Sequence, residues 1–517
     1  MSLIQHIDYL GIAPVLALAV TALAVLVADL FLPPGRVDVL SGLSIAGTLT
    51  ALGFGVWLPA AGALSRHTFC LPHGGCSYVV DEFTAFFQVL FLVALLVVLL
   101  LSLPTVVEQR LASGEFHFLL LSSVTGMLVL AAARDLLSLV VALEVVSLPA
   151  FVLVGLRRSD PRGGEAALKF FLFSVVSTAL TIYGMALVYG VAGSLQVDRI
   201  AAALTHVHAA GGSKSALAAA AVVLVVVGFA FKISAVPFHF WAPDTYQGAP
   251  VPIAAFLSTA SKAAGFAGLL ILLFDAFRPY ADVWGPVVAA LAAVTMTVGN
   301  LVALRQWHLV RLLAWSTVSQ AGYMLVPLGV AATAAGRVAG ELHLAGQATL
   351  AYLAIYVAMN LGAFACVAVI VRREPRGGIE DIRGLARRRP GLAVAFALFL
   401  TALAGLPPGV AGLFAKVVVL RDAVHGHVTW LAIVAAVNTV VGLAYYLRVA
   451  ALMFAGASEA EPEPAEPALA AGPTRRSLPV AAGLGLALAA TVALSAYPQL
   501  VFDWAHDAAG ATRAAQR

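Results

Sequence analysis

Long hydrophobic runs, separated by short polar connections, cover the chain from one end to the other. Each run has roughly 18 residues or more, which is enough for a helix to cross about 30 Å of hydrocarbon. The pattern predicts an all-α polytopic membrane protein with about 14 transmembrane helices. The runs lie near residues 11–31, 38–62, 84–104, 117–133, 136–156, 168–191, 216–247, 251–274, 284–304, 310–331, 347–371, 391–421, 429–455 and 478–501.

The composition agrees with this pattern. Of the 517 residues, 62% are hydrophobic and 11% are charged, whereas a soluble domain has about 25% charged residues. No loop is long enough for a separate soluble domain, and the sequence contains no phosphate-binding glycine motif or CxxC pair. The first run has no basic segment before it and no small-residue cleavage site after it, so we expect a retained span and not a signal peptide.

The basic residues predict an orientation. When the loops are assigned alternately to two sides, 18 of the 30 Lys and Arg residues lie on the side of Arg157 and the cluster Arg372–Arg389, and 9 lie on the other. Because cytoplasmic loops carry the excess of basic residues, we expect both termini to face outward, away from the cytoplasm. The net charge of +4 then reflects topology and gives no reason to expect a nucleic acid partner.

This orientation places the segment FCLPHGGCSY in an oxidising compartment. Cys70 and Cys76 enclose a loop with two glycines there, so a disulfide and two free thiols both remain open. A metal site that uses His73 is the weaker alternative, and we expect no metal in this chain.

Three of the five lysines, Lys232, Lys262 and Lys416, fall inside hydrophobic runs, whereas the 25 arginines cluster in loops and at run ends. Arginine keeps its proton under ordinary conditions, but a buried lysine can release it. The placement therefore indicates proton transfer within the bilayer. The alternative is that each stem carries its ammonium group to the membrane surface. This is least favoured for Lys262, which lies ten residues beyond Pro252, or about 15 Å deep.

Other polar residues accompany these lysines. Ser258 and Thr259 lie one turn before Lys262 on the same face and predict a hydrated lining. Glu144 is the one acidic residue deep within a run. We expect Glu144 to pair with an intramembrane lysine, since two charges about 4 Å apart gain about 4 kcal/mol at an effective dielectric constant of about 20. The alternative is a neutral acid that is hydrogen-bonded to a neighbouring helix.

Prolines interrupt two of the runs. The seventh carries Pro237 five residues after Lys232, and the twelfth carries Pro407 and Pro408 before Lys416. Interior prolines free backbone carbonyls that then need other partners, so we expect two broken helices.

The two interrupted runs lie five runs apart, each with one lysine. This spacing predicts an inverted repeat of runs 4–8 and 9–13, as in many transporters. The expected division is 1–110 for the first three runs, 111–275 and 276–456 for the two repeats, and 457–517 for a cytoplasmic loop and the last run.

The segment FKISAVPFHFWAPDTYQGAPVPIAAFLSTASK resembles the seventh and eighth spans of the subunit N family of bacterial NADH-quinone oxidoreductase, or respiratory complex I. ALEVVSLPAFVLVGL, AYLAIYVAMNLGAFACV and LAGLPPGVAGLFAK are similar to spans 5, 11 and 12 of that family, and the likeness covers nearly the whole chain. The YQGAP element separates subunit N from the antiporter-like sister subunits.

The resemblance implies that Glu144, Lys232, Lys262 and Lys416 are proton-channel residues, and His239 matches the histidine of the PFHxWxPD element. It also implies a non-redox subunit of a translocase, which moves protons while NADH, FMN, iron–sulfur clusters and quinone bind to other subunits. No cofactor is expected in this chain. The expected partners are other membrane subunits, the lipid bilayer and protons. We expect protons to enter from the cytoplasm near the two helix breaks and to leave outward from Lys416.

The tenth run departs from the family pattern. Val310 and Arg311 stand where the family usually has a Lys-Arg pair, and Gln320 replaces a histidine that is frequent in the family. Because glutamine does not titrate near neutral pH, water would have to connect Lys262 and Lys416. These differences leave open a diverged second copy that serves an incomplete or modified complex. A subunit of a multisubunit cation/proton antiporter, and a structural subunit whose lysines only stabilise packing, also stay open.

Overall fold

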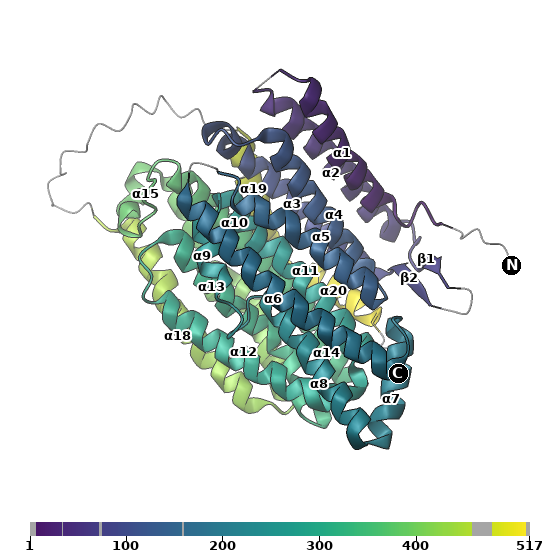
Figure 1. Ribbon diagram of the computed structural model, residues 1–517. Coiled ribbons are helices and arrows are strands. Elements are labelled where there is room, and N and C mark those ends of the chain that lie inside the picture. Colours follow the sequence, from purple (N-terminus) through teal and green to yellow (C-terminus); the bar gives the residue numbers. More distant parts are fainter. Residues whose placement is uncertain (1–6, 34, 72–74, 158–159, 457–477, 513–517) are drawn as a thin grey trace.

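The computed structural model describes residues 7–512 except 34, 72–74, 158–159 and 457–477. The expected cytoplasmic loop at 457–477 therefore lies outside the described residues. Most helices run between the two ends of one elongated bundle (Figure 1). The elements follow in the order α1 (Ala13–Phe31), α2 (Val37–Ala60), β1 (Arg66–Cys70), β2 (Cys76–Val80), α3 (Glu82–Glu108), α4 (Ser113–Ala132), α5 (Leu136–Val154), α6 (Pro161–Ala192), α7 (Val197–Ala210), α8 (Gly212–Lys232), α9 (Trp241–Gly248), α10 (Val251–Phe256), η1 (Leu257–Ser261), α11 (Lys262–Leu270), η2 (Ile271–Ala276), η3 (Arg278–Tyr280), α12 (Ala281–Ala303), α13 (Leu309–Leu325), η4 (Pro327–Ala332), η5 (Ala335–Arg337), α14 (Ala339–Val371), η6 (Glu380–Ile382), α15 (Leu385–Arg388), α16 (Pro390–Ala404), α17 (Val410–His425), α18 (Thr429–Phe454), α19 (Leu478–Ala496) and α20 (Gln499–Gly510).

The helices have the length and composition of membrane spans. In the described part of the chain, 12 helical stretches are long and apolar enough to cross a membrane. The hydrophobic runs near 310–331 and 391–421 form shorter pieces, α13 with η4 and α16 with α17. The prediction of an all-α polytopic membrane protein is confirmed.

Two helices stop where the prolines occur. α8 ends at Lys232 and α9 begins only at Trp241, with Pro237 between them. The freed backbone finds partners from both sides of the gap: the Val236 amide donates to Thr295 Oγ1 (2.9 Å), and the Trp241 indole donates to the Phe231 carbonyl (3.0 Å). In the second case α16 ends at Ala404 and α17 begins at Val410.

The centre of the bundle is the stretch Val251–Ala276, in which every residue after Val251 is buried. It packs against α3, α4, α8 and α14. Its hydrogen bonding changes from α to π at Leu257–Ser261 and again at Ile271–Ala276. Single π-turns inside α-helices are frequent at functional sites, and here Lys262 follows the first of them directly.

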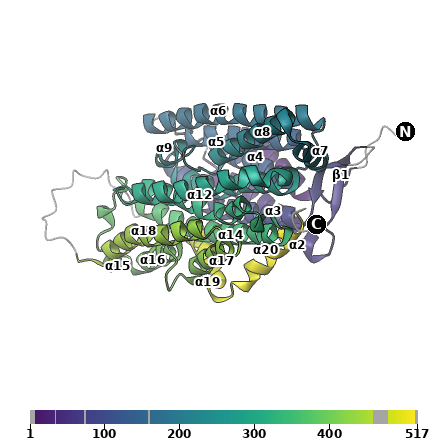
Figure 2. The same cartoon turned by 90° about the horizontal axis from the view of Figure 1, so that it is seen from below.

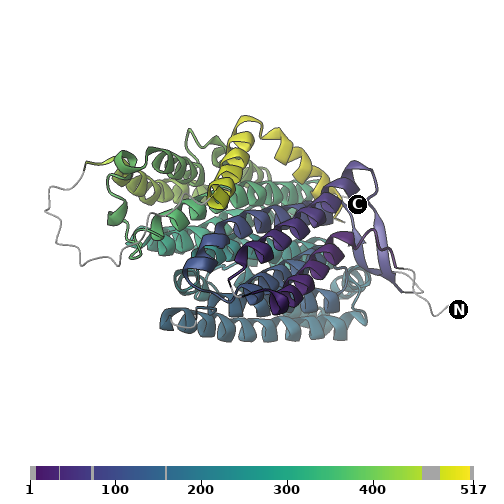
Figure 3. The same ribbon diagram turned by 90° about the horizontal axis from the view of Figure 1, so that it is seen from above.

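The β-hairpin, α7 and α20 lie at one end of the bundle, and α15 lies at the other (Figures 2 and 3). Cys70 and Cys76 are joined by a disulfide where the two strands meet. The hairpin is held to the chain before α1 by an ion pair between Arg66 and Asp8 (2.8 Å). The hydropathy pattern predicts no span at α7, because its 14 residues are too few and too polar to cross a membrane.

Candidate functional site

Lys232 and Glu144 share a site between α5, α6 and α8 but do not form the expected direct pair. The Lys232 ammonium group donates to Ser147 Oγ (2.9 Å), and Thr178 Oγ1 donates to Glu144 Oε1 (2.8 Å). Among the ion pairs within 4.0 Å in the described chain, none joins Glu144 to Lys232. Because Ser147 lies one turn beyond Glu144 on α5, a hydroxyl group takes the place that we expected the carboxylate to occupy.

A small polar cavity joins these residues. It has a volume of about 30 Å³, and Glu144, Ser147 and Lys232 contribute to its wall together with the hydroxyl residues Ser174, Ser177, Thr178 and Thr181. A polar cavity larger than about 10–15 Å³ can hold a water molecule. The cavity can therefore connect the carboxylate and the ammonium group through water or hydroxyl groups.

A glycine brings the Lys232 region against the central helix. A Cβ atom on Gly265 would lie 2.8 Å from Ile233 Cγ2 and 3.0 Å from Lys232 Cγ. Real Cβ atoms essentially never approach other atoms within 3.0 Å, so only glycine permits this contact. The stem of Lys232 thus packs against α11, three residues beyond Lys262.

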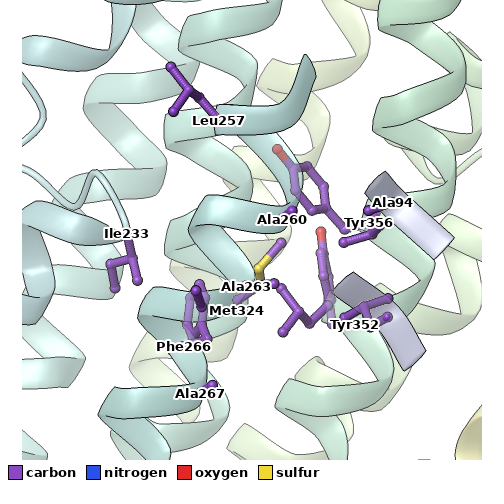
Figure 4. Packing of buried hydrophobic residues seen from close by; sticks show 14 of the residues in the cluster. Ala94, Ile233, Leu257, Ala260, Ala263, Phe266, Ala267, Met324, Tyr352 and Tyr356 are labelled. Carbon is purple, nitrogen blue, oxygen red and sulfur yellow. The ribbon is translucent and has the colours of Figure 1, made fainter. Parts of the chain in front are cut away.

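Lys262 is buried, with 1% of its surface exposed. Its ammonium group donates to the carbonyl oxygen of Thr317 on α13 (2.8 Å). The Tyr356 hydroxyl on α14 lies 2.9 Å from the Ser258 carbonyl oxygen and 3.2 Å from Thr317 Oγ1. Figure 4 shows Tyr352 and Tyr356 reaching from their helix into the buried cluster that includes Ala260 and Ala263.

Ser258 and Thr259, the predicted polar lining beside Lys262, use their hydroxyl groups for hydrogen bonds within their own helix. Ser258 Oγ and Thr259 Oγ1 both donate to the Ala255 carbonyl (2.9 and 2.6 Å). Asn360 Nδ2 donates to Ser258 Oγ (2.9 Å) and to the Tyr356 hydroxyl (3.0 Å). Ser258 and Thr259 therefore lie on buried helix turns next to Lys262. Ser258 also belongs to a hydrogen-bond network that reaches α14.

Gln320 connects three further helices. Its Oε1 accepts a hydrogen bond from the Tyr352 hydroxyl (2.5 Å), and its Nε2 donates to the Leu403 carbonyl (3.1 Å) and to the Tyr446 hydroxyl (3.2 Å). Tyr446 is also 2.5 Å from Ser316 Oγ. The amide thus holds two tyrosine hydroxyls in the region between Lys262 and Lys416.

Lys416 lies against the second helix break. Its ammonium group donates to the Ala404 carbonyl (2.7 Å) and lies 5.1 Å from the centre of the Tyr323 ring. Tyr323 in turn stacks on Tyr352, with ring centres 6.3 Å apart. A Cβ atom on Gly405 would lie 3.0 Å from Lys416 Cδ. The break therefore supplies both the free carbonyl and the space that the lysine occupies.

His239 lies in the first break, with 6% of its surface exposed, and its ring centre is 5.1 Å from that of Trp315. Two buried polar atoms, Trp315 Nε1 beside this ring and Thr245 Oγ1 on α9, have no hydrogen-bond partner among the described residues. Buried polar groups are normally hydrogen-bonded to protein or ordered water, so these atoms indicate hydration of the break. Asp244 beside them holds Lys169 and Arg311 (3.0 and 2.8 Å).

Sequence patterns point to the lysines, Glu144 and the prolines, but they do not reveal most of the groups that connect them. These are mainly hydroxyl groups on α13, α14 and α18: Ser316, Thr317, Tyr323, Tyr352, Tyr356 and Tyr446. In the sequence, only their position inside apolar runs distinguishes these residues. Tyrosine and threonine often occur in such runs without a functional role. Within the described ranges, no group of three or more His, Cys, Asp and Glu side chains could hold a metal ion.

Comparison with known proteins adds to this geometry. Residues 133–442 match the protein family described as "NADH:quinone oxidoreductase/Mrp antiporter, TM". The chain is 48% identical over 516 residues to a Streptomyces griseus protein named NADH-quinone oxidoreductase subunit N 2, covering 98% of this chain and 94% of that protein.

Two solved structures have a similar fold. Respiratory complex I from Thermus thermophilus with bound aureothin contains a chain that is 31% identical, with a TM-score of 0.72 and coverage of 95% of this chain and 98% of that one. A chain of the Mrp complex from Dietzia is 22% identical, with a TM-score of 0.81 and coverage of 97% of both chains. The second likeness shows the fold alone.

Proposed function

The chain belongs to the family of NADH-quinone oxidoreductase subunit N, and we propose that it moves protons across the bacterial inner membrane as a non-redox subunit of a complex I-type translocase. Quinone reduction, with its NADH, FMN and iron–sulfur clusters, takes place on other subunits. The partners of this chain are then other membrane subunits of the complex and the lipid bilayer. Both termini face outward, and the excess of basic residues lies in the cytoplasm.

One observation carries this proposal: three buried lysines each donate to an uncharged oxygen. Lys232 uses a serine hydroxyl, whereas Lys262 and Lys416 use the backbone carbonyls of Thr317 and Ala404. A buried charge without an opposite charge beside it is expensive, and intramembrane ionisable groups of this kind mark proton pathways. A purely structural role would favour carboxylate partners, which tie the proton to the amine.

The contacts between the lysines support a path. Protons from the cytoplasm reach the cavity of Glu144 and Lys232 through the hydrated first break. Lys262 receives charge across the contact at Gly265 and passes it on through the hydroxyl groups around Gln320. Because Gln320 does not titrate, the hydroxyls of Tyr352 and Tyr446, with water, carry the proton toward Lys416.

The two lysines at helix breaks also support an inverted repeat. Lys232 ends the helix before the first break, and Lys416 bonds the last carbonyl before the second. We propose that residues 111–275 and 276–456 are the two copies, with 1–110 and 457–517 as additions at either end.

Proton pumping in membrane vesicles that carry the assembled complex tests the function. Lys262→Arg keeps the positive charge but cannot release its proton. We expect it to assemble, to lose pumping and to slow coupled NADH–quinone electron transfer. Lys214→Arg, at an exposed lysine, is the matched control and should pump normally. Normal pumping by Lys262→Arg would show that a fixed charge suffices and would contradict the relay.

The second candidate is a subunit of a multisubunit cation/proton antiporter. The description of the matched family includes Mrp antiporters, and the Dietzia chain has the same fold. Sodium-dependent proton movement in vesicles without NADH would favour this candidate. A complex that pumps with NADH but contains a reduced set of subunits would instead favour the diverged complex I-like assembly.

A further inference from the structure

Asp422 is a buried acidic residue outside the relay described above. It lies on α17, six residues beyond Lys416, or about 9 Å along the helix axis. The following helix, α18, ends beside α15, where the Gly384 amide donates to the Leu452 carbonyl. Because α18 runs back toward α15, the preceding helix α17 runs away from α15. Asp422, which follows Lys416 on α17, therefore lies nearer to the opposite end of the bundle, where the β-hairpin and α7 lie (Figure 2). Our orientation makes this the outer side.

The Asp422 carboxyl group is enclosed and unpartnered. Its residue is 6% exposed, and neither carboxyl oxygen has a hydrogen-bond partner among the described residues. The hydroxyl group of Thr333 donates to the carbonyl oxygen of Gly426 (2.7 Å), four residues beyond Asp422. Gly426 packs against Val330 of η4, where an added Cβ atom would lie 2.5 Å from Val330 Cβ. Asp422 therefore neither caps a helix nor bridges elements, so its carboxyl group has no structural task.

A second carboxyl group acts on Asp422 from α14. Glu341 interacts electrostatically with Asp422, and its Oε2 is also buried without a partner in the described chain. Arg421, the adjacent cation, points to an exposed position. Burial opposes ionisation of the Asp422 carboxyl group, and the negative charge of Glu341 opposes it further, so Asp422 can keep a proton. The two groups thus form a site that holds and exchanges one proton.

We propose that Asp422 is the outward proton-release group of this chain, with Glu341 as the next carrier toward the outer surface. This inference rests on the proposed function. In each cycle the Asp422 carboxyl group gives its proton to Glu341 or to water near it and becomes a carboxylate. The Lys416 ammonium group then loses one proton, which returns the carboxylate to the acid and leaves a neutral amine. One proton leaves for each proton that Lys416 gives up.

Asp422→Asn keeps the shape of the side chain but cannot carry a proton. Since the carboxyl oxygens make no hydrogen bond in the described structure, we expect the variant to assemble. The pumping rate should fall about tenfold or more, because a positioned proton-transfer group typically contributes ~10²-fold or more to a rate. Asp422→Glu should retain most of the pumping. Asp507→Asn, at an exposed acidic residue, is the matched control and should pump like the wild type.

Infrared spectroscopy of the assembled complex gives a readout that does not depend on pumping. A protonated Asp422 should contribute a carbonyl band that shifts on exchange into D₂O. That band should be present in the wild type and in Asp507→Asn, absent in Asp422→Asn and displaced in Asp422→Glu. If Asp422→Asn fails to assemble, the displaced band in Asp422→Glu still decides the question.

The failure of this inference differs from the failure of the proposed function. If Lys262→Arg stops pumping but Asp422→Asn pumps normally, the relay stands and the assignment of Asp422 is overturned. Unchanged carbonyl bands in both Asp422 variants would also overturn it. If Lys262→Arg pumps normally, the proposed function itself fails.

Discussion

The ammonium group of Lys416 donates a 2.7 Å hydrogen bond to the carbonyl oxygen of Ala404, the last residue of α16. That carbonyl is free because the helix stops before Pro407 and Pro408. The helix break and the lysine are therefore one unit, in which the break provides an uncharged acceptor that stabilises the ammonium group without holding its proton permanently.

Replacing Lys416 by methionine separates function from stability. We expect Lys416→Met to abolish coupled pumping while the melting temperature of the complex stays unchanged or rises. Removing a buried charge relieves a desolvation cost that is often as large as the interaction it makes. Thermal unfolding and vesicle pumping on the same preparation measure both effects. A loss of stability by several kcal/mol would instead identify Lys416 as a structural residue.

The contact between Ser147 and Lys232 can be used to test whether Lys232 must release its proton. Ser147→Asp places a carboxylate where the hydroxyl now accepts from Lys232 at 2.9 Å. An ion pair with an effective dielectric constant of about 20 is worth about 4 kcal/mol at 4 Å, so we expect the proton to stay on the amine and pumping to slow by at least ~10-fold. Ser147→Thr keeps the hydroxyl and serves as the control. Equal pumping by both variants would show that the proton does not pass through Lys232.

Gly265 can be tested by adding one methyl group. Gly265→Ala would bring Cβ to 2.8 Å from Ile233 Cγ2 and 3.0 Å from Lys232 Cγ. Overpacking of this kind typically costs about 1–3 kcal/mol, and the shift of Lys232 should lower the pumping rate. Gly190→Ala on α6, where an added Cβ meets no atom within 4 Å, should leave the stability and the pumping rate unchanged. Melting curves and pumping rates that are equal for the two variants would contradict the close contact.

Gln320→Leu removes the amide that holds Tyr352 and Tyr446. It leaves the Leu403 carbonyl and the Tyr352 hydroxyl without this partner, whereas Tyr446 keeps its contact with Ser316, and each unsatisfied buried group costs about 1–3 kcal/mol. We expect lower thermal stability and slower pumping. Gln320→His restores hydrogen bonding and adds a titratable group, so it should pump better than the leucine variant. If Gln320→Leu pumps at the wild-type rate, the path does not run through these hydroxyls.

The ion pair between Asp8 and Arg66 makes the β-hairpin sensitive to acid. Burial alone would raise the pKa of Asp8, but hydrogen bonds from the Gly11 amide and the Arg66 guanidinium outweigh this effect and lower the pKa below its ordinary value of 3.8. The stabilisation is therefore complete above about pH 4 and is lost as the pH falls through the lowered pKa. The protection factors of the amides of residues 66–70, which correct for the pH dependence of intrinsic exchange, should fall at low pH in the wild type, whereas Asp8→Asn should show low protection factors throughout.

Some parts of this site follow from the sequence because their causes are local. A lysine inside an apolar run and a proline inside a helix have the same meaning in almost any membrane fold, so Lys262 and the break at Pro237 were found directly. The separation of Glu144 and Lys232 depends on how α5, α6 and α8 pack. Sequence spacing does not contain that information, so the serine and threonine between the two charges could not be predicted.

The tyrosines illustrate the same limit. Tyr352 and Tyr356 lie on a buried, apolar stretch of α14, and a tyrosine there is usually ordinary packing. Asn360 on the same helix gives Tyr356 one partner, and the approach of α13 and the central helix gives these hydroxyl groups their other polar partners. Likewise, Asp422 stands at the end of a run beside Arg421, where an acidic residue normally meets water. Its enclosure by η4 and α14 is a property of the tertiary structure.

The complete burial of the stretch after Val251 has a consequence for how the protein meets its membrane. Lys262 is separated from the acyl chains by a full layer of helices, whereas Glu144 lies on a half-exposed face of α5, next to the exposed side chains of Val141 and Val145. A change in bilayer thickness or lipid composition therefore acts on the perimeter of the molecule before it acts on the centre. In the proposed path, Lys262 is therefore insulated from the surroundings of the chain, whereas Glu144 lies close to them.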